Sequence, residues 1–282
     1  MKIKKKYRIL CAVLAGIVLL LAVGLLWYRA DWRFRLWNAI RIYPKPDLKE
    51  VTVEAEAISL EDAREQGALN TFLLLVNADH PLPQGYVPEL AEYNGARMHP
   101  EMVDAYASLR DVLQETTGER IHVSSDYRTP EEQEEILASK GGEIAAGVGC
   151  SEHEAGLALD VYVKGYGSMS FLKTEAGRET SRRCDTYGFI IRYPDGKEKI
   201  TGITYEPWHL RYVGQPHASI IMDCGLTLEE YIDLFEVGVW YDTGDYFIGR
   251  FEVDDLKIPA DTSEWSVSPD NTGTYIVTAK KG

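Results

Sequence analysis

The sequence predicts an α+β domain preceded by a membrane-spanning helix and followed by a small β-rich extension. Three observations lead to this prediction. Residues 9–26 carry no charge, residues 100–117 repeat apolar side chains at helical spacing, and residues 157–163 alternate as a half-buried strand does. The composition, 45% hydrophobic and 26% charged, is typical of a globular protein and excludes a disordered chain.

Residues 1–30 are predicted to form a basic cytoplasmic stub and a transmembrane anchor. Five Lys or Arg residues precede the uncharged segment, which as a helix would span about 27 Å, close to the thickness of the hydrocarbon core. Basic residues on that side favour a cytoplasmic N-terminus, so the rest of the chain should be extracytoplasmic. A cleaved signal peptide is the alternative, but residues 25–29 offer no small-residue cleavage site.

Residues 31–69 are predicted to form a membrane-proximal stalk. Residues 32–37 mix aromatic and basic side chains, which suit a membrane interface, and Pro44-Lys45-Pro46 follows. An amphipathic helix packed on the domain explains residues 32–37 equally well.

Charge divides sharply along the chain. Residues 1–46 hold ten basic residues and one acidic residue, whereas the remainder has 20 basic and 43 acidic residues, a net charge of −23. An acidic domain is a poor partner for nucleic acid. The acidic surface suits solubility near an anionic envelope, although a simply solvated surface accounts for it equally well.

Helices are predicted by their end signals. Residues 100–117 begin with proline at a first-turn position and stop at Gly118. After a short strand over residues 121–125, Thr129-Pro130-Glu131-Glu132 forms a capping box, and the helix it begins should run to Lys140 and end at Gly141-Gly142.

Three further strands are predicted before residue 239. In residues 157–163, Asp160 projects from the face opposite the aliphatic row. The others cover residues 188–193, closed by Pro194-Asp195-Gly196, and residues 208–213. Residues 239–282 contain two more short alternating stretches, at 246–251 and 274–278, and are predicted to form a β-rich extension.

His153, Asp160, Glu206 and His209 are the candidate catalytic constellation. Three protein ligands leave the fourth position of Zn²⁺ open for a water, whose pKa the ion lowers to about 7. We expect His153, Asp160 and His209 to bind zinc and Glu206 to act as general base. A chance arrangement is the alternative, and Asp160 could equally pair with a cross-strand Lys or Arg. In a plain strand Glu206 and His209 would point apart, so we predict a bend at Pro207, or else a helical turn.

The sequence around these residues resembles the VanY-type D-alanyl-D-alanine carboxypeptidases, zinc peptidases that are related to D-Ala-D-Ala dipeptidases and share a fold with the hedgehog signalling domain. The resemblance covers roughly residues 70–235. The segments that carry it are 74–83, 125–129, 151–160, 187–194 and 206–214.

By this resemblance, the family's zinc ligands fall on His153, Asp160 and His209, its catalytic carboxylate on Glu206, and its substrate-binding arginine on Arg128. The resemblance also implies a small antiparallel sheet that carries the zinc site, with helices packed on one side. Residues 70–238 are then expected to be a zinc D,D-carboxypeptidase domain at the cell surface, acting on the stem peptide of peptidoglycan.

Arg128 follows a strand and precedes a helix, and guanidinium pairs well with the free carboxylate of a substrate's C-terminus. A surface arginine paired with Glu131 or Glu132 is the alternative. Tyr127 and Ser151 are also candidate substrate-binding residues, although such hydroxyls often bond to nearby backbone.

Two other signals lead elsewhere. Residues 170–173 match the Ser-x-x-Lys motif of penicillin-binding proteins, but the partner motifs are missing, so we interpret the match as chance. Cys150, Cys184 and Cys224 are an odd number outside the membrane and a poor disulfide framework.

The alternative functions are a related D,D-dipeptidase or L-Ala-D-Glu endopeptidase, or a zinc-containing module that binds without hydrolysis. Retention of Glu206 argues against the last.

Overall fold

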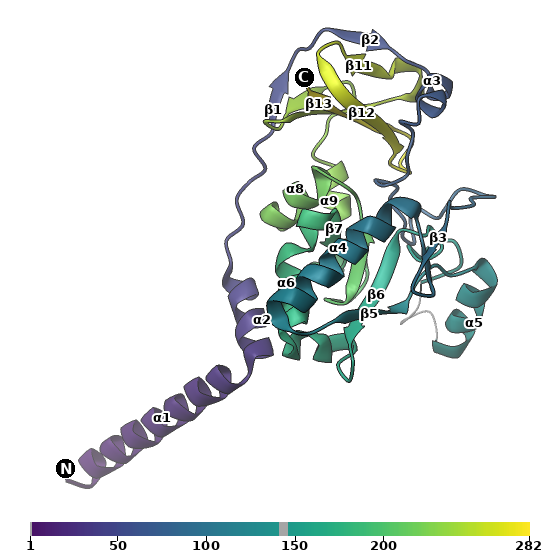
Figure 1. Ribbon diagram of the computed structural model, residues 1–282. Helices are drawn as coiled ribbons and strands as arrows, with labels where there is room; N and C mark the ends of the chain where they lie inside the picture. Colours follow the sequence, from purple (N-terminus) through teal and green to yellow (C-terminus); the bar gives the residue numbers. More distant parts are fainter. Residues whose placement is uncertain (1, 141–145) are drawn as a thin grey trace.

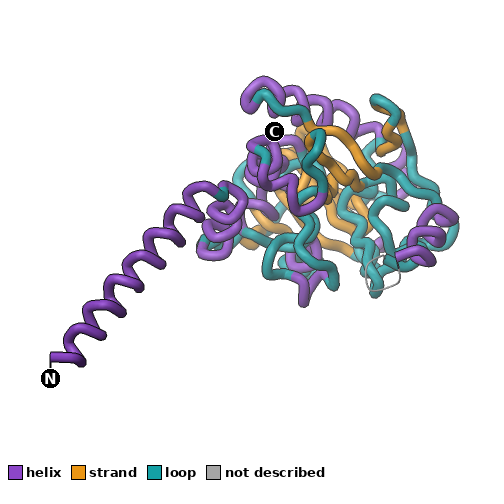
Figure 2. The backbone as a smooth tube through the Cα atoms, turned by 90° about the horizontal axis from the view of Figure 1, so that it is seen from below, coloured by secondary structure: helices purple, strands orange, loops and turns teal. Residues whose placement is uncertain are grey.

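The computed structural model describes residues 2–140 and 146–282. Figure 1 shows an α+β unit, a β-rich unit above it, and a long N-terminal helix that projects to the lower left from beside the α+β unit. The same helix extends away from the body in the perpendicular view of Figure 2. The helices are α1 (Lys2–Tyr28), α2 (Ala30–Ile40), α3 (Leu60–Glu65), α4 (Pro100–Thr117), α5 (Pro130–Lys140), α6 (Glu175–Arg183), α7 (Glu198–Thr201), α8 (His217–Cys224) and α9 (Leu228–Ile232), with 3₁₀ turns η1 (Ser168–Lys173), η2 (Cys184–Tyr187) and η3 (Val253–Asp255).

The α+β unit is built on a four-stranded antiparallel sheet in the order β5-β6-β8-β7. Its strands are β5 (Ile121–Ser125), β6 (Ala158–Val163), β7 (Phe189–Ile191) and β8 (His209–Tyr212). The predicted strands over these regions are therefore confirmed. In β6 the aliphatic residues are buried while Asp160 and Tyr162 are only partly covered, as the alternating pattern predicted.

The two predicted helices of this unit are confirmed. Pro100 occupies the first turn of α4, and Gly118 ends it with a φ of 74°, a conformation that suits glycine. At α5, the Thr129 N–H donates to Glu132 at 2.8 Å, and the Glu132 N–H donates to the Thr129 hydroxyl at 3.2 Å. This is the predicted capping box. The predicted end at Gly141-Gly142 lies outside the described residues.

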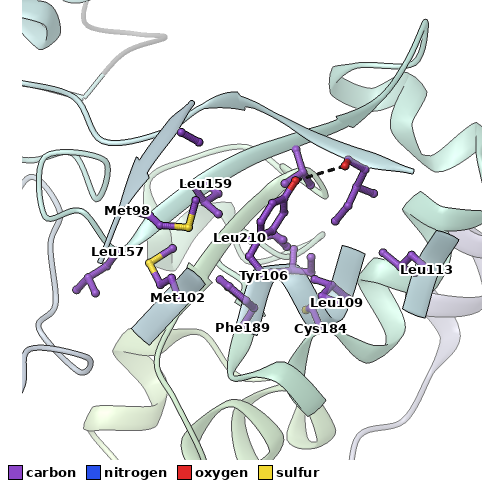
Figure 3. Close-up of a cluster of buried hydrophobic side chains, with 14 of the residues drawn as sticks. Met98, Met102, Tyr106, Leu109, Leu113, Leu157, Leu159, Cys184, Phe189 and Leu210 are labelled. Carbon is purple, nitrogen blue, oxygen red and sulfur yellow. Dashed lines mark hydrogen bonds between the residues drawn. The ribbon is translucent and has the colours of Figure 1, made fainter. Parts of the chain in front are cut away.

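A hydrophobic core fills the space between α4 and the sheet (Figure 3). The buried face of α4 follows helical spacing and meets buried side chains of β6, β7 and β8. Because this core covers one face of the sheet, Asp160 is left on the other face. The α4 residues in the core are Met102, Tyr106, Leu109 and Leu113.

The C-terminal unit is a five-stranded sheet in the order β1-β9-β10-β13-β12 beside a two-stranded pair, β2 and β11. The strands are β1 (Lys49–Val51), β2 (Ala55–Ala57), β9 (Trp240–Asp242), β10 (Tyr246–Phe251), β11 (Lys257–Pro259), β12 (Thr262–Pro269) and β13 (Tyr275–Lys281). A separate hairpin of β3 (Ala91–Tyr93) and β4 (Ala96–Met98) lies beside α4. The predicted alternating stretches at 246–251 and 274–278 are thus strands.

The prediction of a stalk over residues 31–69 is corrected by these pairings. Val51 pairs with Trp240 and Ala57 pairs with Lys257, so residues 49–57 complete the C-terminal unit. Ala63 on α3 is buried in the hydrophobic core of this C-terminal unit. The physical reason is that these short strands obtain their hydrogen bonds from segments almost 200 residues away in the chain.

Helix α2 packs on the α+β unit, which was the alternative to membrane contact. Phe34 is 3% exposed, and the Arg182 guanidinium lies 5.1 Å from its ring centroid. Arg35 also pairs with Asp195 at 3.0 Å. The region following α1 is therefore tied to the α+β unit.

Candidate metal centre

Three potential ligands meet on the open face of the central sheet. One ligand atom from each of His153, Asp160 and His209 lies within 4.8 Å of the others. Asp160 and His209 are directly opposite each other on β6 and β8. His153 belongs to the turn that leads into β6, so residues 56 positions apart in sequence reach one point.

The ring of His153 is oriented by the backbone of a neighbouring loop. Its Nδ1 lies 2.9 Å from the carbonyl oxygen of Asp126, which can only accept a hydrogen bond. Nδ1 therefore carries the proton, and Nε2, 3.6 Å from Asp160 Oδ1, presents its lone pair to the centre. Burial lowers the pKa of His153, which favours the neutral form that binds metal.

His209 uses its other nitrogen. Its Nδ1 lies 3.0 Å from Asp160 Oδ1, and its Nε2 lies 3.4 Å from Glu152 Oε2. Burial alone would lower the pKa of His209, but hydrogen bonds to Asp160 and Glu152 raise it to about 9. Burial alone would raise the pKa of Asp160, but the two histidines hold it well below its usual range. Asp160 is thus an ionised carboxylate between two imidazoles.

Glu206 reaches the same place through the predicted bend. The His209 N–H donates to the Glu206 carbonyl at 3.1 Å, which closes a turn across Pro207. Glu206 Oε2 lies 3.9 Å from His209 Nδ1, and the carboxylate side chain remains 26% exposed. The turn places a solvent-accessible carboxylate beside the three candidate ligands.

Arg128 is held at the start of α5 in a fixed orientation. Its guanidinium donates to Gln133 Oε1 at 2.6 Å and to Ser125 Oγ at 2.8 Å, and its backbone N–H donates to the His153 carbonyl at 3.2 Å. Both of these side-chain acceptors are neutral groups, and the carboxylates of Asp160 and Glu154 act on the charge of Arg128 electrostatically. The predicted alternative, pairing with Glu131 or Glu132, is not the arrangement found: Glu132 caps α5 instead.

The two candidate hydroxyl residues have less defined surroundings. Ser151 is 6% exposed at the start of the turn that contains His153. Tyr127 lies under the Arg97 guanidinium, whose carbon is 5.1 Å from the ring centroid. Their contact with a substrate remains a prediction. Ser170, from the penicillin-binding motif, donates its hydroxyl to the Gly167 carbonyl in a 3₁₀ turn.

Sequence reasoning missed Glu152. Its side chain is completely buried and bonds to Arg192 Nε at 2.6 Å and Arg211 Nη1 at 2.7 Å. Burial alone would raise the pKa of Glu152, but Arg211 and Arg192 hold it far below its usual range. A glutamate next to a candidate histidine was the only local signal, because its partners lie far along the chain.

The donor set fits zinc. Two imidazole nitrogens and one carboxylate oxygen are the ligand types of catalytic zinc sites, which keep a further position for water or substrate. Cys150, three residues before His153 in the sequence, is a free thiol whose pKa is raised by burial, which disfavours the thiolate form that binds metal.

Comparison with known proteins agrees with this chemistry. The model of the VanY family, D-alanyl-D-alanine carboxypeptidase, matches residues 95–215. A D-alanyl-D-alanine carboxypeptidase of Enterococcus faecalis is 34% identical over 203 residues, which cover 65% of this chain and 74% of the relative. An Enterococcus faecium enzyme of the same name is 34% identical over 178 residues, but the match spans only 57% of its length and 57% of this chain.

Two solved structures are also similar. VanYB in complex with D-alanine-D-alanine is 36% identical, with a TM-score of 0.53, covering 58% of this chain and 98% of VanYB. A variant of the vancomycin-resistance D,D-pentapeptidase VanY in complex with Zn(II) is 37% identical, with a TM-score of 0.51, covering 57% of this chain and 98% of that protein.

Proposed function

Because the chain belongs to the VanY family of D-alanyl-D-alanine carboxypeptidases and is a metallopeptidase, we propose that it removes the terminal D-alanine from peptidoglycan stem pentapeptides with zinc as cofactor. The observation that carries this proposal is the meeting of His153, Asp160 and His209 beside Glu206, inside the region that matches the family.

His153, Asp160 and His209 would hold the ion. When bound, zinc supplies a Lewis acid that polarises the scissile carbonyl and acidifies a water molecule. Asp160 contributes the one formal negative charge of the ligand set, and the carbonyl of Asp126 fixes the ring of His153. The site is thus preorganised by backbone and carboxylate contacts.

Glu206 transfers the proton between the attacking water and the leaving group. Its carboxylate takes a proton from the attacking water and delivers it to the nitrogen of the departing D-alanine, so one residue acts first as base and then as acid. Its position at the end of a tight turn, partly exposed and near His209, suits this role.

Arg128 binds the free carboxylate of the substrate's last residue. Guanidinium and carboxylate form two parallel hydrogen bonds, which select a peptide that ends at this point. Gln133 and Ser125 hold the side chain in place before the substrate arrives. This preorganisation supports carboxypeptidase rather than endopeptidase specificity. The hydroxyls of Tyr127 and Ser151 would bind peptide groups of the stem.

Helix α1 bears on where the protein lies in the cell. Residues 6–25 are long and apolar enough to cross a membrane, with a mean hydropathy of 2.6, although a signal sequence has the same properties. We infer a retained single-pass anchor with the N-terminus inside and the α+β unit outside, where peptidoglycan lies. Mass spectrometry of the membrane-extracted protein tests this: loss of residues 1–28 would show cleavage.

The direct test measures D-alanine released from UDP-MurNAc-pentapeptide by the full chain in detergent, with zinc and with a chelator. We expect release only with the metal, and a Glu206→Gln variant should release at least about a hundredfold less. Glu198→Gln, on the short helix before the same turn, is the matched control. Metal-independent release, or full activity of Glu206→Gln, would overturn the mechanism. Release of the D-Ala-D-Ala dipeptide would identify a dipeptidase instead.

A further inference from the structure

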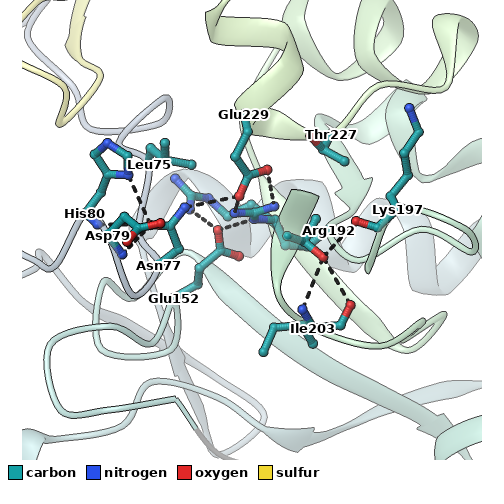
Figure 4. Close-up of polar contacts among 12 residues, drawn as sticks. Leu75, Asn77, Asp79, His80, Glu152, Arg192, Lys197, Ile203, Thr227 and Glu229 are labelled. Atoms are coloured by element: carbon teal, nitrogen blue, oxygen red, sulfur yellow. Dashed lines mark hydrogen bonds and ion pairs between the residues drawn. The ribbon is translucent and has the colours of Figure 1, made fainter. Parts of the chain in front are cut away.

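A cluster of four charged side chains, three of them fully buried, lies behind the candidate metal centre. Glu152, Arg192, Arg211 and Glu229 form it, and Figure 4 shows the part that runs from Glu152 through Arg192 to Glu229. The two carboxylates balance the two guanidinium groups. None of the three side chains nearest the centre is exposed: Glu152, Arg192 and Arg211 are all fully buried.

Both arginines bind the same oxygen of Glu152. Arg192 Nε is 2.6 Å and Arg211 Nη1 is 2.7 Å from Oε1. The second oxygen, Oε2, therefore faces away from them and lies 3.4 Å from His209 Nε2. One oxygen anchors the carboxylate while the other faces the imidazole.

The arginines are themselves fixed. Arg211 donates to the carbonyls of Phe72 and Leu74 at 3.1 and 2.7 Å. Arg192 makes a bidentate pair with Glu229, which also accepts from Asn77 at 3.2 Å (Figure 4). Glu152 consequently has little freedom to move away from His209.

This contact fixes which nitrogen of His209 faces the candidate metal centre. Nε2 points at Glu152, so Nδ1, 3.0 Å from Asp160 Oδ1, lies on the side of the other candidate ligands. A metal ion held at Nδ1 would leave one ring proton, on Nε2, where Glu152 accepts it. Without the carboxylate, the ring loses the hydrogen bond that sets this orientation. His153 needs no such partner, because the Asp126 carbonyl performs the equivalent task.

We propose that Glu152 is a positioning residue that holds the ring of His209 in the orientation required for metal binding. The inference rests on the proposed function, since it concerns the same metal centre. Glu152 acts through His209 and does not itself touch the reacting atoms.

The test compares zinc affinity of Glu152→Gln with the wild-type full chain in detergent, by competition with a coloured chelator. Partners of metal-binding histidines typically contribute a factor of 10–100 in affinity, so we expect the dissociation constant to rise by about that amount. The matched control is Glu154→Gln, since Glu154 is also buried in this turn but bonds to the Gly149 N–H. Unchanged affinity in Glu152→Gln, or an equal loss in Glu154→Gln, would overturn the proposal.

A second measurement covers the case in which Glu152→Gln fails to fold. In the zinc-loaded wild-type chain with ¹⁵N-labelled histidine, the Nε2 proton of His209, assigned with a His209→Gln variant, should appear at low field and exchange slowly with water. Rapid exchange of this proton would contradict a bond to Glu152. Neither readout uses a substrate, so absence of D-alanine release would contradict the proposed function without deciding this question.

Discussion

The central sheet and the C-terminal sheet each bury a carboxylate against an arginine, but the two carboxylates are satisfied differently. Asp270, 0% exposed, accepts from Arg250 Nε at 2.9 Å and from the Thr272 N–H and hydroxyl at 2.8 and 2.9 Å. Thr274 completes the set through its hydroxyl and N–H. Glu152, in contrast, is anchored through one oxygen and offers the other to His209.

The difference distinguishes a structural carboxylate from one that serves a site. The partners of Asp270 come mostly from its own turn, so its charge stabilises local backbone. The partners of Glu152 are Arg192, which directly follows β7, and Arg211 on β8, and they connect the candidate metal centre to the sheet. Variants of the two clusters should therefore separate stability from metal chemistry.

The largest effect on stability is expected at Arg192. Its replacement in Arg192→Met leaves Glu152 and Glu229 without a common partner in a buried position, which should lower the free energy of unfolding by about 3–5 kcal/mol. Arg192→Met/Glu229→Met restores charge balance and should lose less. Urea denaturation of the full chain in detergent measures both, and equal destabilisation would show that charge balance is not what matters.

Arg128→Lys should change substrate binding with little effect on stability. Lysine keeps the charge but lacks the fork that makes two parallel hydrogen bonds, so we expect KM for the pentapeptide to rise about a hundredfold, equivalent to about 2.7 kcal/mol. Steady-state release of D-alanine measures this. Arg120→Lys, an exposed arginine bonded to Gln114, is the control. An unchanged KM would exclude Arg128 as the carboxylate clamp.

Asp270→Asn should lower the stability of the fold and leave zinc binding and substrate turnover unchanged. Loss of the charge weakens the bonds from Arg250 and the threonines, and hydrogen bonds to charged groups contribute about 2 kcal/mol to stability. We expect that loss in urea denaturation, together with unchanged zinc affinity and unchanged D-alanine release. Weaker zinc binding in this variant would show that the two clusters are coupled.

The features that the sequence could predict are those that depend on residues close together in the chain. The ends of α4 and the capping box of α5 depend on residues three or fewer positions apart or on one glycine, and both were correct. The bend at Pro207 was also local. Strands β1 and β2 were missed because a three-residue strand shows no period, and their partners lie near the other end of the chain.

In the candidate site, too, locally encoded residues could be predicted and residues paired over long sequence distances could not. His153, Asp160, His209 and Glu206 were found through residue type, spacing and family resemblance, and the structure brings them together. Glu152 was not found, because its partners Arg192 and Arg211 are 40 and 59 residues away and no local pattern connects them. Long-range pairing of charges is a property of the folded sheet rather than of any segment.

The smallest expected effect concerns a third buried polar group, His217, which lies where the two units meet. Its Nδ1 is 2.6 Å from the Tyr231 hydroxyl on α9, and its Nε2 is 3.0 Å from the Thr278 hydroxyl on β13. Neither partner is charged, and burial lowers the pKa of His217 to about 3. The folded chain therefore holds this ring neutral, unlike His209.

Stability should consequently decrease in mild acid. Since the unfolded pKa is near 6.5, the unfolded chain binds the proton first, and folding free energy is lost as pH falls through 6.5 toward 3. Between pH 7 and 5.5 this group should account for about 1 kcal/mol. The measurement is urea denaturation at both pH values for wild type and His217→Gln, because other titrating groups cancel in the difference. If the variant loses as much as wild type, His217 is not the group responsible, and the junction between the two units is insensitive to acid.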